Sequence, residues 1–476
     1  MRLRMILSVV TLFLSGTAQS AVVCHLPPDD PGNQKTLIVG DAAIADHLLH
    51  GDSLGACGCP TVACDYTPLH VREGAKGRMD GTEANPFGTI EKALKFAEKS
   101  GLTCVDLQLK AGFYSEDVIR QTLNLKIAGL EPGVILATEV SNNGPYSLSL
   151  SDLKFVNAPG GDEPAISVAN ECADTTLQNV VVENIEGVGL RQQGGMVLMD
   201  GVTMRQTSLT ESSSSGSAIS LENGVSACIG DATLSDNDRS GLSVSGQGTQ
   251  VLIYDAAIER NGVTEAESLT GGISISLGAV VLGQDLAINE NMLTGIVVEQ
   301  SSRASFRDTS VARTQGPDGI TVVGVYVDNS SELEMSYAAL CESQLVGALL
   351  DSTGTAAVAL LTNTLVANNP IGLSIEGSGD GAQAQLLTCI PASRFVNNEI
   401  NVDALFLPPP RPFAELNCSN GIDDDLDGDI DCADNDCADS FSCVGSTLCP
   451  QVSFAPTWCD TNLSMPVAVP ICPDPL

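Results

Sequence analysis

The stretch SGLSV at residues 240–244 recurs as GGISI at 271–275, TGIVV at 294–298 and VGVYV at 323–327. Each copy follows a turn with a small residue and then alternates inward and outward side chains, as a half-buried β-strand does. Related phrases extend the series in both directions. Their first aliphatic residues are Ile166, Leu190, Ile219, Leu242, Ile273, Ile296, Val325, Leu349, Leu373 and Val402. Steps of about 23 residues, with occasional insertions of about six, predict a solenoid.

The chain between these phrases is also built from short β-forming runs. Residues 251–261, 280–291 and 304–315 are rich in Val, Ile and Leu, and Asn, Asp, Ser and Gly separate them. None has a sustained 3.6-residue period, which argues against leucine-rich or helical repeats. A coil of this length accommodates three short strands joined by tight turns, each paired in parallel with its counterpart in the next coil. The sequence therefore predicts an all-β solenoid of about 11 coils.

Polar residues recur in register at two corners of the predicted coil. Asn tolerates left-handed backbone geometry, so it suits a corner that is repeated coil after coil. Stacked Asp side chains about 5 Å apart repel one another, so we expect them to be solvated; a cation or cationic ligand along this ridge is the alternative. The first column is Asp152, Asn179, Asp200, Asp231, Asp255, Asp285, Asp308 and then Tyr337; the second is Asn184, Asn237, Asn261, Asn291, Asn368 and Asn397.

A third pattern, at residues 81–101 and 105–116, carries a family resemblance. Its residues are Asn85, Pro86, Phe87, Thr89, Ile90, Ala93, Leu94, Gly112 and Tyr114. They resemble the opening segment of secreted bacterial right-handed parallel β-helix proteins of the pectate-lyase-like fold, in which N-P-F-x-T-I-x-x-A-L leads through a short helix into a strand ending in Gly-x-Tyr. The resemblance spans about residues 71–407 and implies that fold. It implies little about activity, because the fold hosts lyases, hydrolases, esterases and adhesins.

The same segment predicts a helix from Thr89 to Lys99. Ile90, Ala93, Leu94 and Ala97 form an apolar stripe, and Gly101 can end the helix. We expect it to cover the open first coil, whose strand edges would otherwise invite aggregation.

Charge and composition divide the chain into five parts. We expect a signal peptide at 1–21, a Cys/His-containing segment at 22–70, the β-helix with its cap at 71–407, a Pro-rich linker at 408–416 and an Asp/Cys-rich module at 417–476. A formal charge of −37 excludes binding to nucleic acid or anionic membranes by bulk electrostatics. Secretion or display on the cell surface, without an integral membrane segment, is the predicted location.

Sixteen cysteines agree with export to an oxidising compartment. Five lie up to Cys104, four lie in the coils and seven follow from Cys418, so complete pairing requires at least one bridge between regions. All four histidines lie in or beside the N-terminal cysteine cluster, which leaves a zinc site as an alternative to disulfides there. The histidines are His25, His47, His50 and His70, and the clustered cysteines are Cys24, Cys57, Cys59 and Cys64.

The clearest chemical motif is NGIDDDLDGDIDCADNDC at residues 420–437. Ca²⁺ takes six to eight hard oxygen ligands, and this spacing, with Gly428 at the sharp turn, matches a calcium loop. Position 12 is Asp rather than Glu and no good helix flanks the loop, so it is more similar to dockerin or thrombospondin type-3 loops than to an EF-hand. We expect weak affinity, on the order of 0.1–1 mM, and stapling by nearby cysteines. The predicted ligands are Asp423, Asp425, Asp427, Asp429, Asp431 and Asp434.

Three classes of function are open at this stage, one of which is a purely structural envelope protein. The favoured one is a non-catalytic module that presents a loop-bearing face to a glycan or a protein. The alternative is a polysaccharide lyase or glycoside hydrolase, which would need acidic residues and a base in one cleft. No histidine follows His70 to supply a Gly-His-Gly motif, and aromatic residues are few. The lysines beyond residue 100, all near the start of the β-helix, are Lys110, Lys126 and Lys154. The candidate bases are Arg239, Arg260, Arg303, Arg307 and Arg313, and the candidate carboxylates are Asp236, Asp238, Glu259, Asp285, Glu290 and Asp308.

Overall fold

A computed structural model describes residues 20–25, 35–40, 53–54 and 64–404, apart from residues 117, 157–163, 210–215, 263–270, 318–319, 329, 353–356 and 378–392. The chain divides into two compact units, one of residues 1–61 and 453–466 and one of residues 62–452 and 467–476. In the first unit, three strands form an antiparallel sheet in the order β2-β1-β3. They are β1 (Ser20–His25), β2 (Lys35–Gly40) and β3 (Ser53–Leu54).

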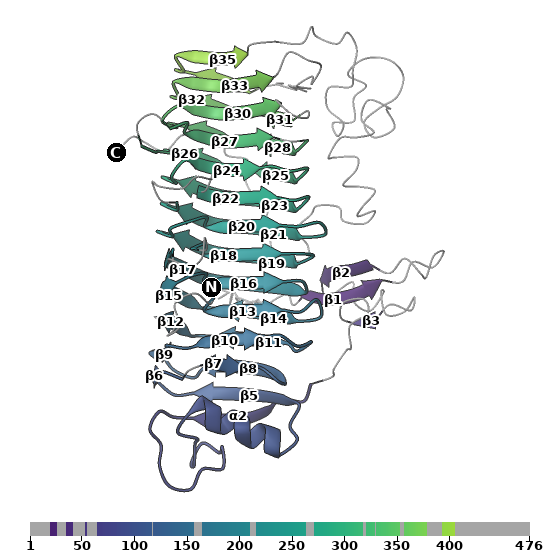
Figure 1. Ribbon diagram of the computed structural model, residues 1–476, viewed down its shortest axis with the longest axis vertical. Helices are drawn as coiled ribbons and strands as arrows, with labels where there is room; N and C mark the ends of the chain where they lie inside the picture. Colours follow the sequence, from purple (N-terminus) through teal and green to yellow (C-terminus); the bar gives the residue numbers. More distant parts are fainter. Residues whose placement is uncertain are drawn as a thin grey trace, which may run out of the picture. The chain divides into compact units, whose positions relative to one another are not determined.

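The second unit contains a parallel β-solenoid, which confirms the predicted architecture (Figure 1). One of its sheets, which we call face A, has twelve strands that stack one per coil in sequence order. They are β7 (Val118–Arg120), β10 (Glu139–Asn142), β13 (Ile166–Ala169), β16 (Leu190–Gln193), β18 (Ile219–Glu222), β20 (Leu242–Ser245), β22 (Gly271–Ser276), β24 (Thr294–Val298), β27 (Val323–Asp328), β30 (Val346–Ser352), β33 (Ile371–Gly377) and β35 (Ile400–Ala404).

The remaining twenty strands form one sheet that bends round a corner and so supplies two faces. In each coil the chain runs first along one face of this sheet, which we call face B, then turns the corner and runs along the other, face C. The first set, on face B, is β4 (Thr67–Val71), β5 (Cys104–Leu109), β8 (Asn124–Gly129), β11 (Leu148–Ser151), β14 (Asp174–Gln178), β25 (Arg303–Arg307), β28 (Glu332–Ser336) and β31 (Val358–Thr362). Face C contains β6 (Gly112–Tyr114), β9 (Val134–Leu136), β12 (Lys154–Val156), β15 (Val181–Glu186), β26 (Ser310–Ala312), β29 (Ala339–Cys341), β32 (Leu365–Ala367) and β34 (Arg394–Val396). Four long strands run through both faces: β17 (Met196–Ser208), β19 (Ser226–Ser235), β21 (Gln250–Glu259) and β23 (Val280–Asn289).

Apolar side chains from all three faces fill the interior as one continuous core. The aliphatic series that opens the face A strands lies in this core, as predicted, with two exceptions. Val402, on the last described strand, is 40% exposed. The other exception is Leu349. Val325 pairs with Ala348 rather than with Leu349, and Leu349 packs instead in an outer cluster with Val323 and Val346. In GALLD at 347–351, the inward residue is therefore Ala348 and not the expected Leu349. A shift of one residue places a strand side chain on the opposite face of the sheet.

The corner between faces B and C is the predicted Asp column, with one correction. Residues with left-handed φ occupy it in nine successive coils, and Gly201, not Asp200, is the member in its coil. Asp200 is one residue early and pairs with Gln178 at the end of the face B strand. Because glycine adopts positive φ without strain, it substitutes for Asp or Asn at such a corner. The column is Asp152, Asn179, Gly201, Asp231, Asp255, Asp285, Asp308, Tyr337 and Asn363.

Helix α2 (Ile90–Lys99) confirms the predicted cap (Figure 1). Thr89 is its N-cap, since its side chain accepts a hydrogen bond from the Lys92 backbone N–H. Ile90, Ala93 and Ala97 are buried against the start of the core, and the helix contacts β4 and β5. It therefore covers the first coil, as the sequence indicated. Among the described residues, no helix is long and apolar enough to cross a membrane.

A disulfide joins Cys64 to Cys104 at the beginning of the solenoid. It decides one of the N-terminal alternatives for Cys64, whose thiol is used in a disulfide rather than in a zinc site. Cys172, Cys228 and Cys341 in the coils are also disulfide-bonded.

Candidate functional site

The chain insertions leave the solenoid at one corner, between faces C and A. The length of each insertion follows from the sequence distance between the buried polar residue of this corner and the first inward residue of face A. This distance is 12 residues from Thr207 to Ile219, 12 from Asn261 to Ile273 and 11 from Thr314 to Val325. In the coils between them the same step is only five residues. The insertions at 207–217, 262–271 and 314–323 therefore start at equivalent places in every second coil.

Residues at this corner also have left-handed φ, and several of them are charged. We call the column the charged corner. Its charges alternate in sign over five successive coils, from Asp236 to Glu342, so neighbouring charges along the column are opposite rather than like. The column is Asn184, Gln206, Asp236, Arg260, Glu290, Arg313, Glu342, Asn368 and Asn397.

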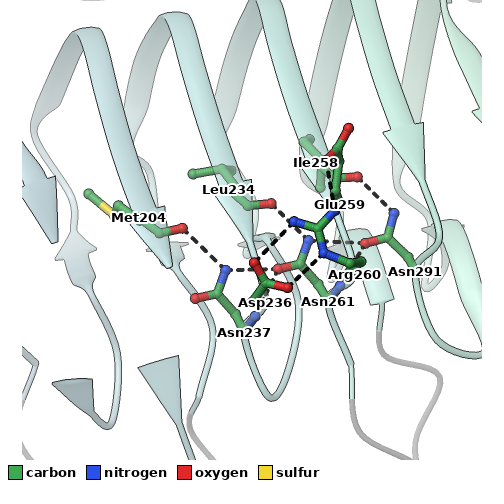
Figure 2. Close-up of polar contacts among 9 residues, drawn as sticks. All are labelled: Met204, Leu234, Asp236, Asn237, Ile258, Glu259, Arg260, Asn261 and Asn291. Atoms are coloured by element: carbon green, nitrogen blue, oxygen red, sulfur yellow. Dashed lines mark hydrogen bonds and ion pairs between the residues drawn. The ribbon is translucent and has the colours of Figure 1, made fainter. Parts of the chain in front are cut away.

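Arg260 is the centre of the best-defined ion pair of this corner (Figure 2). Its Nε and Nη2 atoms donate to the two carboxylate oxygens of Asp236 at 2.7 and 3.1 Å, and Nη1 donates to Glu259 at 3.0 Å. The hydrogen bond from Arg260 holds the pKa of Asp236 below its usual range, and Asp236 raises the pKa of Arg260. The guanidinium therefore stays protonated at any physiological pH.

A buried amide ladder fixes the backbone beneath these charges (Figure 2). The Asn237 side-chain amide donates to Asn261 at 2.8 Å, and that of Asn261 donates to Asn291 at 3.0 Å. Each amide also donates to a backbone carbonyl of the preceding coil, those of Met204, Leu234 and Ile258. The ladder holds successive corners in register, which makes the charged corner a rigid surface.

The second predicted Asn column was therefore two columns in one. Asn184, Asn368 and Asn397 lie in the charged corner, one residue before the ladder. The ladder itself continues in the later coils through Asn369, whose amide donates to Asn398 at 3.3 Å. Adjacent Asn-Asn pairs at 368–369 and 397–398 make the two columns indistinguishable by sequence spacing alone.

Most of the predicted catalytic cations are neutralised by carboxylates. Arg303 pairs with Glu332 at 3.3 Å and Arg307 with Asp308 at 3.3 Å, both on face B or its corner. Arg313 lies 3.2 Å from Glu290, without the geometry of a hydrogen bond.

The three predicted lysines are also engaged. Lys154 and Arg205 both donate to the nearly buried Glu183, which lowers the pKa of that carboxyl. Lys110 pairs with Glu83 at 3.5 Å, and the ammonium of Lys126 lies 4.1 Å from the centre of the Tyr66 ring. These contacts place the lysines away from the charged corner, near the start of the stack.

Arg239 differs from the other candidate arginines. No carboxylate in the described part of the chain pairs with its guanidinium, and its Nε is buried without a hydrogen-bond partner. Its backbone N–H donates to Gly216 at the base of the first insertion. The neighbouring Asp238 accepts the Leu209 N–H at 2.8 Å, so this carboxylate is occupied in holding the insertion. Among the described residues, Arg239 is thus a cation without a carboxylate partner, beside a chain insertion.

The corner between faces B and C, which we call the Asp corner, has an Asp at its column position in four consecutive coils. They are Asp231, Asp255, Asp285 and Asp308. Partial burial, together with the charges of Asp308 and Asp255, raises the pKa of Asp285. Burial and the charge of Asp231 raise the pKa of Asp255 in the same way. No group of residues able to hold a metal ion was found among the described residues. The cation along this ridge stays a hypothesis.

Replacing Asp285 by Asn tests this repulsion. At pH 7 we expect Asp285→Asn to raise the free energy of unfolding by about 0.5–1 kcal/mol, because two like-charge contacts disappear. Because the pKa of Asp285 is higher in the folded state than in the unfolded state, its carboxylate destabilises the fold only when the pH is above the unfolded-state pKa. The gain should therefore vanish near pH 3. Urea unfolding at both pH values measures it.

The matched control is Asp152→Asn, at the same corner, where Asp152 accepts a hydrogen bond from Asn179 instead of facing a carboxylate. Equal gains for the two variants, or a gain at Asp285 that does not change with pH, would show that Asn merely suits the left-handed backbone better.

Face A holds a polar group that the sequence analysis missed. The Tyr326 hydroxyl lies 3.1 Å from a carboxylate oxygen of Asp328 and 3.2 Å from one of Asp351 on the next strand. Burial and these two carboxylates raise the pKa of Tyr326, and burial with the charge of Asp328 raises that of Glu299. The signal was present in the alternation of VGVYVD, whose second and fourth strand residues face outward, but the register of the next coil was needed to pair it with Asp351.

The six predicted calcium ligands, Asp423, Asp425, Asp427, Asp429, Asp431 and Asp434, lie outside the described residues, as does the Pro-rich linker. Their geometry is therefore not part of the site described here, and calcium binding stays a prediction from spacing.

Comparison with known proteins agrees with the fold. The family described as "Right handed beta helix region" matches residues 164–382. No curated protein matches the chain. Among solved structures, the periplasmic alginate epimerase AlgG is similar with 11% identity and a TM-score of 0.40 over 63% of this chain and 77% of that one. A GH87 alpha-1,3-glucanase catalytic domain in complex with nigerose has 13% identity and a TM-score of 0.49 over 79% and 71% of the two chains. Pectate lyase Pel9A has 10% identity and a TM-score of 0.38 over 72% and 80%.

The fold defines the class: the described part of the second unit is a right-handed parallel β-solenoid, and residues 164–382 of it match the family model. Fold alone assigns no activity, since one β-helix scaffold hosts many sites.

Proposed function

We propose that this protein is an exported β-helix that binds a neutral glycan, without cleaving it, along the charged corner and the insertions that leave beside it. The observation that carries the proposal is the position of Arg239. A guanidinium that no described carboxylate pairs with lies at the base of an insertion, next to the rigid ion-pair column of Asp236 and Arg260.

The chemistry of the corner favours recognition over proton abstraction. Arg260 is held protonated by Asp236 and Glu259, so it has no neutral form to act as a base near pH 7. Fixed carboxylates accept hydrogen bonds from sugar hydroxyls, and a fixed guanidinium donates them. Because their positions repeat at the strand spacing of about 4.8 Å, the corner offers a regular row of such groups to an extended polymer.

Net charge selects the kind of ligand. A formal charge of −37 repels polyuronates and other anionic polymers over the whole surface. A neutral polysaccharide, or a protein of opposite charge, meets no such barrier.

Export is part of the proposal. The Cys64–Cys104 bridge and the bonded Cys172, Cys228 and Cys341 support an oxidising compartment, where disulfides persist. The basic and apolar start of the chain has the order of a secretory signal.

A binding screen with two arginine variants tests the site. We expect the mature protein to bind at least one neutral polysaccharide on a glycan array, and Arg239→Gln to weaken that binding about tenfold, the effect of losing a charged hydrogen bond. Arg303→Gln is the matched control, because Arg303 is paired on face B, away from this corner. Equal affinity for Arg239→Gln and the wild type would remove this corner from the binding site.

A lyase is the second candidate, since Arg239 is the one candidate arginine in the described coils that lacks a carboxylate partner. The assay is ultraviolet detection of unsaturated uronides after incubation with pectate, alginate, hyaluronan or chondroitin, with and without calcium. We expect no rise in absorbance and no reducing-sugar release. A rise that Arg239→Gln abolishes would establish the enzyme and end the binding proposal.

We also propose that the Asp-rich segment binds Ca²⁺. Its carboxylates repel one another without a cation, so removing calcium should loosen the C-terminal region. We expect chelation to accelerate proteolysis after residue 404 in the full-length protein, and millimolar calcium to restore resistance. Asp427→Asn should raise the calcium concentration needed for protection, whereas Asp403→Asn, on β35 outside the motif, should not. Cleavage that does not respond to calcium would contradict this prediction.

A further inference from the structure

A stripe of small residues on face C is buried although it points away from the core. Its members are Ala312, Ala339, Cys341 and Ala367, with exposed fractions of 0%, 0%, 0% and 4%, and they form a cluster separate from the main core. Their strand neighbours Val311 and Leu340 point inward, so the alternation of the strand sets the stripe outward. We call it the alanine stripe.

The alanine stripe is more buried than equivalent positions elsewhere on the same face. Ala257, Ala287, Ser310 and Ala339 occupy one outward row in four successive coils. Ala257 and Ala287 are half-buried, whereas Ala339 is inaccessible. In the coil beyond the stripe, Val396 is 40% exposed. The covering is therefore confined to the coils of β26, β29 and β32, and these small side chains leave room for a segment to approach closely.

Cys341, within the stripe, is disulfide-bonded, and its partner is neither Cys64 nor Cys104, which bond each other. The seven cysteines after residue 417 are odd in number, so full pairing sends at least one of them to another part of the chain.

We propose that the end of the chain, residues 467–476, docks on the alanine stripe and is bonded to it through Cys341 and Cys472. These ten residues belong to the same compact unit as the solenoid. The sequence VAVPICP at 467–473 is apolar and uncharged, as a segment packed on alanines should be, and Cys472 is its single cysteine. The segments around Cys449 and Cys459 contain Gln451, Asp460 or Trp458, which suit this narrow surface less well.

The bond forms by thiol–disulfide exchange with a disulfide-bearing oxidant of the exporting compartment. The two thiols lose two electrons and two protons and become one disulfide, while the disulfide of the oxidant takes them up and becomes two thiols. The consequence is a closed loop: β35 holds residue 404 at one end and the alanine stripe holds Cys472 at the other. The predicted calcium segment then lies in a loop anchored at both ends rather than in a free tail.

Mass spectrometry of the full-length protein, digested with Asp-N without reduction, tests the pairing. The sequence gives one peptide at 328–350 that contains only Cys341 and one at 460–473 that contains only Cys472. We expect these two peptides to be joined, and to separate on reduction. The linked pair 52–64 and 80–105, which carries the Cys64–Cys104 bridge, is the internal control.

Several results would overturn the proposal. They are Cys341 recovered as a free thiol, Cys341 joined to 439–459 or to an N-terminal peptide, and a covalent dimer on a non-reducing gel, which would make a second copy the occupant. A variant pair adds a second readout. Cys472→Ser should leave a single new thiol per chain that maps to Cys341, whereas Cys459→Ser should leave one that maps elsewhere. A Cys472→Ser protein in which Cys341 stays bonded would contradict the pairing.

Discussion

Asn261→Ala should lower the free energy of unfolding by about 3–4 kcal/mol, because several buried polar groups lose their partners at once. The Asn261 side chain accepts from the amide of Asn237 and donates to Asn291 and to the Leu234 carbonyl. All three asparagines are buried, with exposed fractions of 1% or less, so water does not replace the lost hydrogen bonds. The damage should spread along the stack, since each rung fixes the next.

Urea unfolding followed by circular dichroism measures this loss, and hydrogen exchange of the coils from β19 to β23 shows where the stack opens, since solenoids can unfold in parts. Asn261→Asp is an informative second variant, because it keeps the shape but buries a carboxyl. It should be severely destabilised at pH 7 and partly recover in acid, where the protonated carboxyl can donate again.

Asn397→Gly is the matched control for the ladder, because Asn397 has left-handed φ and glycine adopts that conformation without strain. The Asn397 amide donates to Asn368 at 3.3 Å on the exposed side of the same corner, so its loss should cost no more than about 0.5 kcal/mol. If Asn261→Ala and Asn397→Gly cost the same, the ladder is not a main source of stability.

Much of the solenoid could be predicted from local sequence. The alternation in SGLSV and its relatives identifies the face A strands, and the N-P-F-x-T-I segment identifies the capping helix. Both signals are local, since they depend on strand alternation and on the apolar stripe and cap of one helix. The errors at Asp200, Leu349 and Asn368 share one cause. Each is a one-residue shift between coils, and register between coils is set by pairing across 22 or more residues rather than by neighbours in sequence.

The candidate site was less accessible to prediction for the same reason. The individual charges of the corner, such as Asp236 and Arg260, were visible, but their alternation appears only when coils with and without insertions are aligned. Because every second coil carries an insertion, the charged residues of the column are not evenly spaced in the sequence. The charges of the calcium segment, in contrast, are contiguous, so their motif could be identified without any structure.

The glycine that precedes the first inward residue in seven of the face A strands gives the second large effect. A Cβ on Gly272 would lie 2.3 Å from the Gly295 carbonyl oxygen, 2.8 Å from an Ile288 methyl group and 3.1 Å from the Asn291 amide. The φ of Gly272 is not left-handed, so the glycine is required for space and not for backbone conformation. Gly241, Gly347 and Gly372 meet a ladder amide in the same way. The recurrent glycine and the recurrent asparagine are therefore two halves of one packing arrangement.

We expect Gly272→Val to cost at least about 3 kcal/mol, because it overpacks the interior and displaces the Asn291 rung. Gly272→Ala should cost less but remain clearly destabilising. Ser243→Val is the matched control: Ser243 lies on the neighbouring strand β20 and points outward, where a β-branched residue suits a strand and should change stability by less than about 1 kcal/mol. Urea unfolding of the three variants measures the difference. A Gly272→Val protein as stable as Ser243→Val would show that the coils can separate enough to admit a side chain, and the close glycine–asparagine contact would then not determine the stacking.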